Sequence, residues 1–268
     1  MIDTDKNHEL LPRIERGLPD LCAMLLEERR QDAELPEDPA DQWALFRALV
    51  NTRPPAPASN GFLELQDALL QDILAYRGVT RLADIPPIGE GSRIRLWRGD
   101  ITTLAADAIV NAANSQMLGC FVPGHHCIDN AIHTFAGIQL RLECAHLMEK
   151  QGRPEPTGMA KVTDAFNLPS KCVIHTVGPI AEGFATDTDK ALLANCYTSC
   201  LDAAVEAGCE SIAFCCISTG VFGFPQDEAA AIAVTTVKDW LASQERAIEV
   251  VFNVFTEKDF TLYRKALI

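Results

Sequence analysis

The chain has 268 residues, of which 48% are apolar, and its formal net charge at pH 7 is -14. That length allows a sizeable core, and the apolar fraction is typical of a globular protein. The acidic balance argues against general nucleic-acid binding, which needs a basic surface. No apolar run reaches the roughly 18 residues that span a bilayer, and residues 1–9 lack the apolar stretch of a signal peptide. We therefore expect a cytoplasmic protein that does not bind a membrane.

The first 88 residues have a helical pattern. Apolar residues recur there at steps of three and four positions, notably at Ile14, Leu18, Leu21, Leu25, Leu45, Leu49, Leu65, Leu69 and Ile73. Pro19 is predicted to split the first helix into two short pieces. Residues 53–61 form a turn-rich connector, and the Pro- and Gly-rich segment 86–91 marks a boundary. We predict a helical extension over residues 1–88 and a second domain over residues 89–268.

After this boundary, short apolar runs alternate with helical stretches. The runs at 94–97, 108–110, 160–163, 172–177, 211–216 and 248–255 are predicted to be strands. The stretches at 129–148, 187–207, 226–241 and 258–267 are predicted to be helices. This alternation predicts an α/β sandwich around a parallel or mixed sheet.

Most of the ten cysteines are expected to be free thiols, because a chain without an export signal rarely builds a disulfide framework. Cys196 and Cys200 lie four apart in a helical pattern, and Cys215 and Cys216 lie in an apolar run, so these four are predicted to be in the core. The remaining question concerns the cysteines of the segment 118–133.

Three polar segments follow predicted strands. In residues 99–102, Asp100 is placed to accept a hydrogen bond from an exocyclic amine and the next N–H to serve a ring nitrogen; a plain turn or helix cap is the alternative. Residues 108–115 form a buried strand that ends in a polar turn with two asparagines. Residues 217–225 contain two glycines that permit close backbone approach, and a helix follows. An acidic protein that binds a diphosphate would use such backbone N–H groups.

These segments, together with residues 157–158, 167–169 and 173–179, resemble the macrodomain family in their order and spacing, from about residue 93 to the end of the chain. The resemblance implies a three-layer α/β/α sandwich with a mixed central sheet and ADP-ribose as the ligand. It implies that Asp100 and Ile101 hold adenine, that Phe255 packs against it, and that Asn114 contacts the distal ribose. The loop that would wrap the diphosphate and distal ribose contributes Ser218, Thr219, Gly220, Val221, Phe222 and Gly223.

The segment 118–133 carries two thiols and neighbouring imidazoles, which are metal-ligand types. It is similar to the zinc-dependent macrodomains, in which a Cys is followed by His five residues on and by Cys two beyond. This similarity implies one Zn²⁺ per chain, held by Cys120, His125 and Cys127, with His126 at a variable position. The segment 45–55 also resembles the extension of that subfamily. The alternative is that the two cysteines are buried and bind no metal.

Asp129 aligns with the acidic residue that opens the corresponding helix in hydrolytic macrodomains. At a helix N-terminus its carboxylate is expected in the charged form, able to accept a proton or position water. A simple N-cap is the alternative. With Asn114 it completes the predicted catalytic pair, whereas His133 is predicted to be structural and His175 to be a core residue.

The subfamily resemblance implies a zinc-dependent hydrolase that removes mono-ADP-ribose from modified proteins, from an ester on an acidic side chain. Three protein ligands leave one coordination position open, and two thiolates cancel the charge of the metal. We therefore favour a zinc that orients the distal ribose over one that activates water. The alternatives are O-acetyl-ADP-ribose deacetylation and an ADP-ribose reader without turnover. The resemblance to zinc macrodomains also implies a partner ADP-ribosyltransferase of sirtuin type, of which this chain itself carries no sign. The role of the extension stays open.

Overall fold

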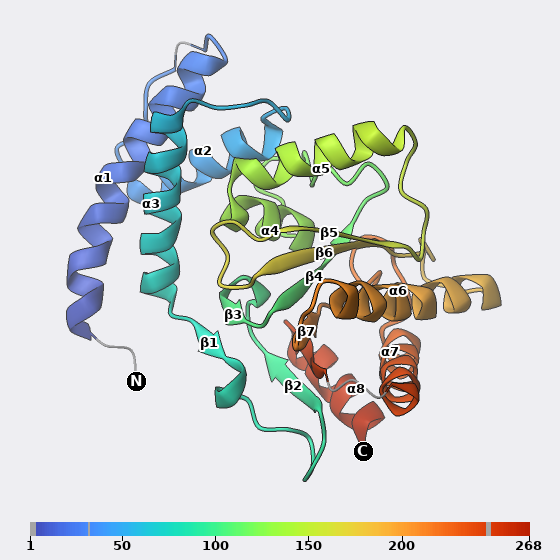
Figure 1. Ribbon diagram of the computed structural model, residues 1–268. Helices are drawn as coiled ribbons and strands as arrows, with labels where there is room; N and C mark the ends of the chain where they lie inside the picture. The colour runs from blue at the N-terminus through green and yellow to red at the C-terminus, as the bar shows by residue number, and fades with distance from the viewer. Residues whose placement is uncertain (1–3, 32, 245–247) are drawn as a thin grey trace.

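The computed structural model describes residues 4–31, 33–244 and 248–268. Figure 1 shows the N-terminal helices standing beside a sheet that is flanked by further helices. Within these ranges no helix has the length and the apolar content that a membrane crossing requires.

The N-terminal region consists of α1 (Thr4–Glu28), α2 (Pro39–Thr52) and α3 (Asn60–Arg77). Asp38 and Ser59 cap the second and third helices, because their side chains accept hydrogen bonds from first-turn N–H groups. The three helices share an apolar core of their own, which includes Leu21, Leu25, Phe46, Phe62 and Leu70. Ile138 of the sandwich also joins this core. The boundary between residues 88 and 89 stays a prediction.

The predicted break at Pro19 is wrong, because α1 runs without interruption through that residue. Proline lacks the N–H of one intrahelical hydrogen bond. Leu18, Leu21 and Leu25, on both sides of the proline, are nevertheless buried against the neighbouring helices. This burial holds both flanking turns in one helix.

The central sheet has six strands in the order β2-β8-β7-β4-β6-β5. Their bounds are β2 Ile94–Arg98, β4 Ala108–Ala113, β5 Ala160–Asp164, β6 Cys172–Val177, β7 Ser211–Phe214 and β8 Glu249–Val254. Only β5 runs antiparallel to its neighbour, so the predicted mixed sheet is confirmed. A separate parallel pair, β1 (Thr80–Arg81) and β3 (Leu104–Ala105), escaped prediction because two residues show no period.

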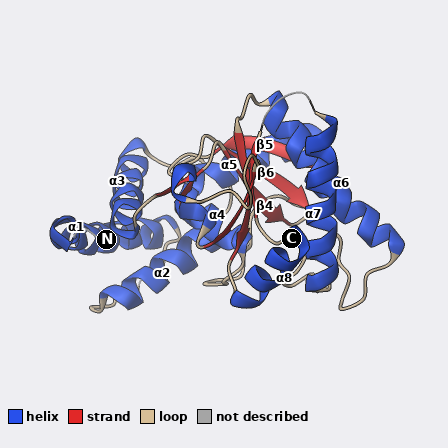
Figure 2. Cartoon of the chain, turned by 90° about the horizontal axis from the view of Figure 1, so that it is seen from below, coloured by secondary structure: helices blue, strands red, loops and turns tan. Residues whose placement is uncertain are grey.

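Helices cover both faces of the sheet, which confirms the predicted three-layer sandwich. Figure 2 shows α4 (Ile128–Ala136) and α5 (Ile138–Gln151) on one face. On the other face lie α6 (Asp187–Glu206), α7 (Gln226–Ser243) and α8 (Glu257–Leu267). The N-terminal helices lie outside the layer of α4 and α5 (Figure 2).

The single helix predicted over residues 129–148 is two helices, because Gly137 breaks it with φ 98°. The side chain of Gln66, from α3, accepts a hydrogen bond from the N–H of Ile138 at 3.0 Å. A Cβ atom on Gly137 would lie 2.7 Å from Nε2 of the same glutamine. The break is therefore set by a contact from the N-terminal helices, which the local pattern cannot show.

Candidate functional site

The predicted site residues gather at one edge of the sheet. Strands β2, β8, β7, β4 and β6 are mutually parallel, so their carboxyl ends share that edge. Asp100 follows β2, Asn114 follows β4, Gly178 follows β6, Ser218 follows β7 and Phe255 follows β8. Five loops that are far apart in sequence thus meet where α/β sheets bind their ligands.

Asp129 and Asn114 are brought together at this edge. Asn114 Nδ2 donates to Asp129 Oδ2 at 3.3 Å and to the carbonyl of Gly119 at 3.0 Å. Asn111 Nδ2 donates to the other carboxylate oxygen at 2.8 Å. The Asp129 side chain is buried in the first turn of α4. Two amides therefore fix the direction of this carboxylate.

The N-cap alternative for Asp129 is wrong, because Cys127 occupies the cap position and its Sγ accepts from the N–H of Asn130. Burial raises the pKa of Asp129 to about 6, while the hydrogen bond from Asn111, the charge of Arg141 and the hydrogen bond from Asn114 lower it. The shift is opposite in sign to the one expected from the helix terminus, since desolvation outweighs the helix dipole.

The thiols of Cys120 and Cys127 and the imidazole of His125 lie together, with their ligand atoms all within 4.8 Å of one another. Cys120 Sγ is 3.5 Å from His125 Nδ1. Tetrahedral zinc, with its usual bond lengths to sulfur and nitrogen, places such a pair about 3.6 Å apart. All three side chains are half-buried and none is sealed in the core, so this donor set fits Zn²⁺. His126 is exposed and lies outside the group.

The loop after β7 is a tight turn with its tip in solvent. Gly223 N–H bonds to the carbonyl of Gly220 and Phe224 N–H to that of Ser218, each at 3.0 Å. Ser218 and Gly223 both have φ 65°. Gly220 is exposed, and Val221 at the tip is 79% exposed. This geometry turns the backbone of the tip outward, as a phosphate cradle requires.

A second loop packs backbone to backbone against the first. The carbonyl of Phe222 accepts from Ala181 N–H at 2.8 Å and from Glu182 N–H at 3.1 Å. A Cβ atom on Gly178 would meet Ser218 Oγ at 2.0 Å. That hydroxyl is buried between the two loops and has no hydrogen-bond partner in the described part of the chain.

At the predicted adenine end, Asp100 is half-buried and highly connected. Its Oδ1 accepts from the N–H of Thr102 at 2.9 Å and from the Thr102 hydroxyl at 2.6 Å. Its Oδ2 pairs with the guanidinium of Arg77 from α3. Ile101 is buried, whereas Phe255 is 76% exposed.

Several side chains that contact the predicted site were missed in the sequence. Arg77 holds Asp100, Asn111 holds Asp129, and Arg47 of α2 contacts the loop of His125. Asn111 had a signal, because it is an amide inside a buried strand. Arg47 lies in the segment 45–55, whose resemblance to the subfamily extension was a signal without an assigned role, whereas Arg77 had no signal. His175 lies in the core as predicted, where Asn111 and Thr163 contact its ring.

The predicted core cysteines are mostly confirmed. Cys196, Cys200 and Cys215 are buried, while Cys216 is half-buried, and both Cys215 and Cys216 lie beyond the end of β7 at Phe214. All ten cysteines are free thiols.

Comparisons with known proteins agree with this geometry. Residues 110–233 match the Macro domain family. The chain is 58% identical to a protein-ADP-ribose hydrolase of Treponema medium, over 87% of this chain and 90% of that protein. It is 53% identical to a protein-ADP-ribose hydrolase of Staphylococcus aureus (strain Mu50 / ATCC 700699), over 87% of each chain.

The chain belongs to the macrodomain family. Among solved structures it resembles the Trypanosoma brucei macrodomain in complex with ADP-ribose, with 30% identity and a TM-score of 0.65. That alignment covers 83% of this chain and 95% of the other. The high identity to named hydrolases over most of the chain identifies this macrodomain protein as an enzyme, a hydrolase.

Proposed function

We propose that this macrodomain hydrolase removes mono-ADP-ribose from modified proteins, from an ester on an aspartate or glutamate side chain. The main observation behind this proposal is that three features lie at one edge of the sheet: the Asn114–Asp129 pair, the Cys-His-Cys group and the loop 218–224. The relatives named protein-ADP-ribose hydrolase support this substrate class. The Trypanosoma brucei complex supports ADP-ribose as the ligand.

The ligand would lie along the carboxyl edge, with adenine between Asp100 and Phe255 and the diphosphate over the tip of the loop 218–224. This arrangement explains how a protein with a net charge of -14 binds an anion. Backbone N–H groups would supply the donors in place of lysines and arginines. The distal ribose would then reach Asn114 and the Asp129 carboxylate.

Cys120, His125 and Cys127 would hold Zn²⁺ beside the distal ribose. A zinc ion bound by these three ligands would supply a Lewis acid with an open position for a substrate oxygen, and so orient the sugar. Asp129, held by Asn111 and Asn114, would accept a proton from water or position it for attack on the ester. The Asn114 amide would fix the ribose relative to that carboxylate.

The direct test is a release assay on proteins that carry mono-ADP-ribose on aspartate, glutamate, serine or arginine, with the zinc content of the enzyme measured. We expect release from the acidic residues alone, loss of release with a chelator, and recovery with added zinc. Release from serine or arginine alone would contradict the ester linkage. Activity confined to O-acetyl-ADP-ribose would show a deacetylase.

Paired variants separate the role of zinc from that of the loop. His125→Ala should lose zinc and turnover, while the neighbouring His126→Ala should keep both, because His126 is exposed and outside the ligand group. Cys120→Ser should weaken ADP-ribose binding as well as turnover. Full ADP-ribose affinity in Cys120→Ser with loss of turnover alone would show that the metal does not orient the ribose.

A further inference from the structure

The loop that carries Cys120, His125 and Cys127 is held from outside the sandwich by α2. Arg47 Nη2 donates to the backbone carbonyl of His125 at 3.1 Å and to Asn130 Oδ1 at 2.9 Å. Asn51 Oδ1 accepts from the N–H of Gly124 at 3.2 Å. Arg47 and Asn51 are four residues apart and thus on one face of α2. That face contacts the loop of residues 118–127, which follows more than 70 positions later in the sequence.

The Asn51 contact is fixed by its surroundings. The side chain is 1% exposed, and its Nδ2 donates to Thr134 Oγ1 of α4 at 3.0 Å. The amide is therefore oriented with its oxygen toward Gly124. Asn130, fully buried, donates from Nδ2 to the carbonyl of Val122 at 3.3 Å. The network that Arg47 and Asn51 enter thus reaches the loop at Val122, Gly124 and His125.

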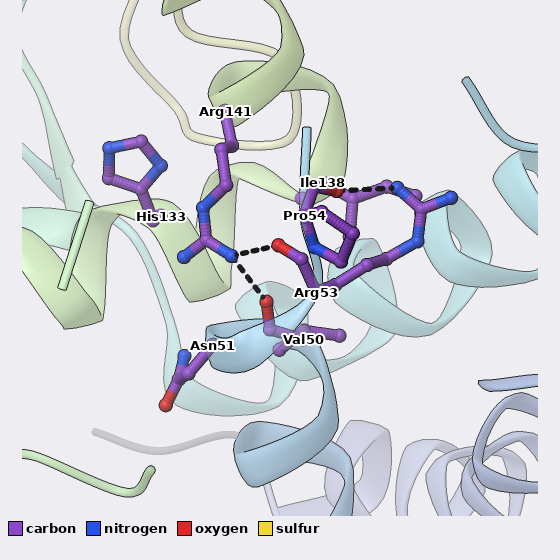
Figure 3. A pocket seen from close by; sticks show the side chains of 8 residues that line it. Val50, Asn51, Arg53, Pro54, His133, Ile138 and Arg141 are labelled. Carbon is purple, nitrogen blue, oxygen red and sulfur yellow. Dashed lines mark hydrogen bonds between the residues drawn. The ribbon is translucent and has the colours of Figure 1, made fainter. Parts of the chain in front are cut away.

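The other end of the loop is tied to the same helix through Arg141 of α5. Its Nε donates to the carbonyl of Leu118 at 2.7 Å, and its guanidinium lies over the ring of Phe121 at 4.3 Å. Figure 3 shows Arg141 between His133 and the end of α2, with hydrogen bonds to the carbonyls of Val50 and Arg53. The cavity drawn there has a volume of about 10 Å³, room for one water molecule.

We propose that Arg47 and Asn51 are positioning residues that hold the Cys-His-Cys loop in its ligand-binding geometry. The N-terminal helices would then be a part of the site as well as a support for the fold. This inference rests on the proposed function, in which the loop binds zinc. Outside α4, residues 118–127 form no regular helix or strand, so their order depends on such side-chain contacts. A preformed loop avoids the conformational cost of ordering when metal binds.

The expected effect acts through the backbone of the loop, because Arg47 donates to the His125 carbonyl and Asn51 accepts from the Gly124 N–H. Removing an outer partner of a metal site typically weakens metal affinity about 10- to 100-fold. We expect that range for Arg47→Ala. Arg47→Lys should recover part of the affinity, because an ammonium can still donate to one of the two acceptors.

Zinc affinity is to be measured by competition with a chromogenic chelator on the full chain, beside thermal unfolding of the metal-free protein. The matched control is Arg29→Ala. Arg29 also binds the end of α2, because it donates to the carbonyl of Leu49 and to Thr52 Oγ1, each at 2.5 Å. Both of these acceptors lie in α2 and not in the loop. We expect Arg29→Ala to lower Tm and leave zinc affinity unchanged. Equal zinc affinities for Arg47→Ala and Arg29→Ala would overturn the proposal.

Amide hydrogen exchange of the metal-free protein gives a readout that needs no zinc. Arg47→Ala and Asn51→Ala should speed exchange across residues 121–127, the Gly124 amide included, and Arg29→Ala should not. If the wild-type protein bound no zinc but the variants still differed in exchange in this way, the proposed function would fail and the positioning role would stand. If zinc bound normally and the pattern were absent, the positioning role would be wrong.

Discussion

The two ends of the predicted ligand site are built in different ways. The distal-ribose end is built from side chains, because the Asn111 and Asn114 amides fix the Asp129 carboxylate. At the diphosphate end, the loop 218–224 and the loop after β6 meet backbone to backbone. A side-chain site can lose its chemistry while keeping its shape. A backbone site has no functional group to remove, but it tolerates no added volume.

The largest effect is expected at the distal end. Asp129→Asn keeps the size of the side chain and one acceptor oxygen but removes the proton-accepting carboxylate. Turnover should fall by about 100-fold or more, while ADP-ribose affinity, measured by calorimetry, should change by less than about threefold.

The control for this variant is Asp187→Asn, which removes an exposed carboxylate from the first turn of another helix, α6. Its turnover should equal that of the wild type. A parallel loss of binding and turnover in Asp129→Asn would show that the carboxylate shapes the pocket instead of acting in the chemistry.

The next effect is expected at the backbone end. In Gly178→Ala the new Cβ would lie 2.0 Å from Ser218 Oγ and 2.8 Å from Ile217 Cγ2, so these side chains at the start of the loop after β7 must shift. ADP-ribose affinity should fall about tenfold or more, and overpacking should lower the free energy of unfolding by about 1–3 kcal/mol.

Gly61→Ala serves as its control, because a Cβ at that helical position meets nothing within 4 Å. Chemical unfolding and calorimetry should show no loss for Gly61→Ala. Wild-type ADP-ribose affinity in Gly178→Ala would show that the loop 218–224 does not bind the diphosphate.

The smallest effect is expected at the adenine end. Phe255 is 76% exposed, so Phe255→Ala should leave Tm nearly unchanged. Loss of stacking on one base costs about 1–3 kcal/mol, which raises the Kd for ADP-ribose at least about fivefold. The Kd for ribose 5-phosphate, which lacks the base, should not change.

Phe166→Ala removes another exposed phenylalanine, one placed after β5 and away from the loops at the carboxyl edge. Phe166→Ala should change neither the Kd for ADP-ribose nor the Kd for ribose 5-phosphate. Equal affinity of Phe255→Ala and wild type for ADP-ribose would place adenine elsewhere.

The sequence by itself determined the sandwich and the order of its loops. Short apolar runs indicate strands because each strand buries its own side chains. The sequence motifs around Asn114, Cys120 and Ser218 have their characteristic residue types at fixed spacing. These are local properties. A segment of a few residues has these properties whichever other elements it packs against.

Only the tertiary structure decided the rest. Gln66 sets the break at Gly137, buried leucines carry α1 through Pro19, and burial gives Asp129 a raised pKa where the helix terminus alone predicts a lowered one. Arg47 and Arg77 reach the predicted site from the N-terminal helices. Each of these effects depends on which surfaces pack together. No local pattern holds that information, because the partners come from separate elements of the chain.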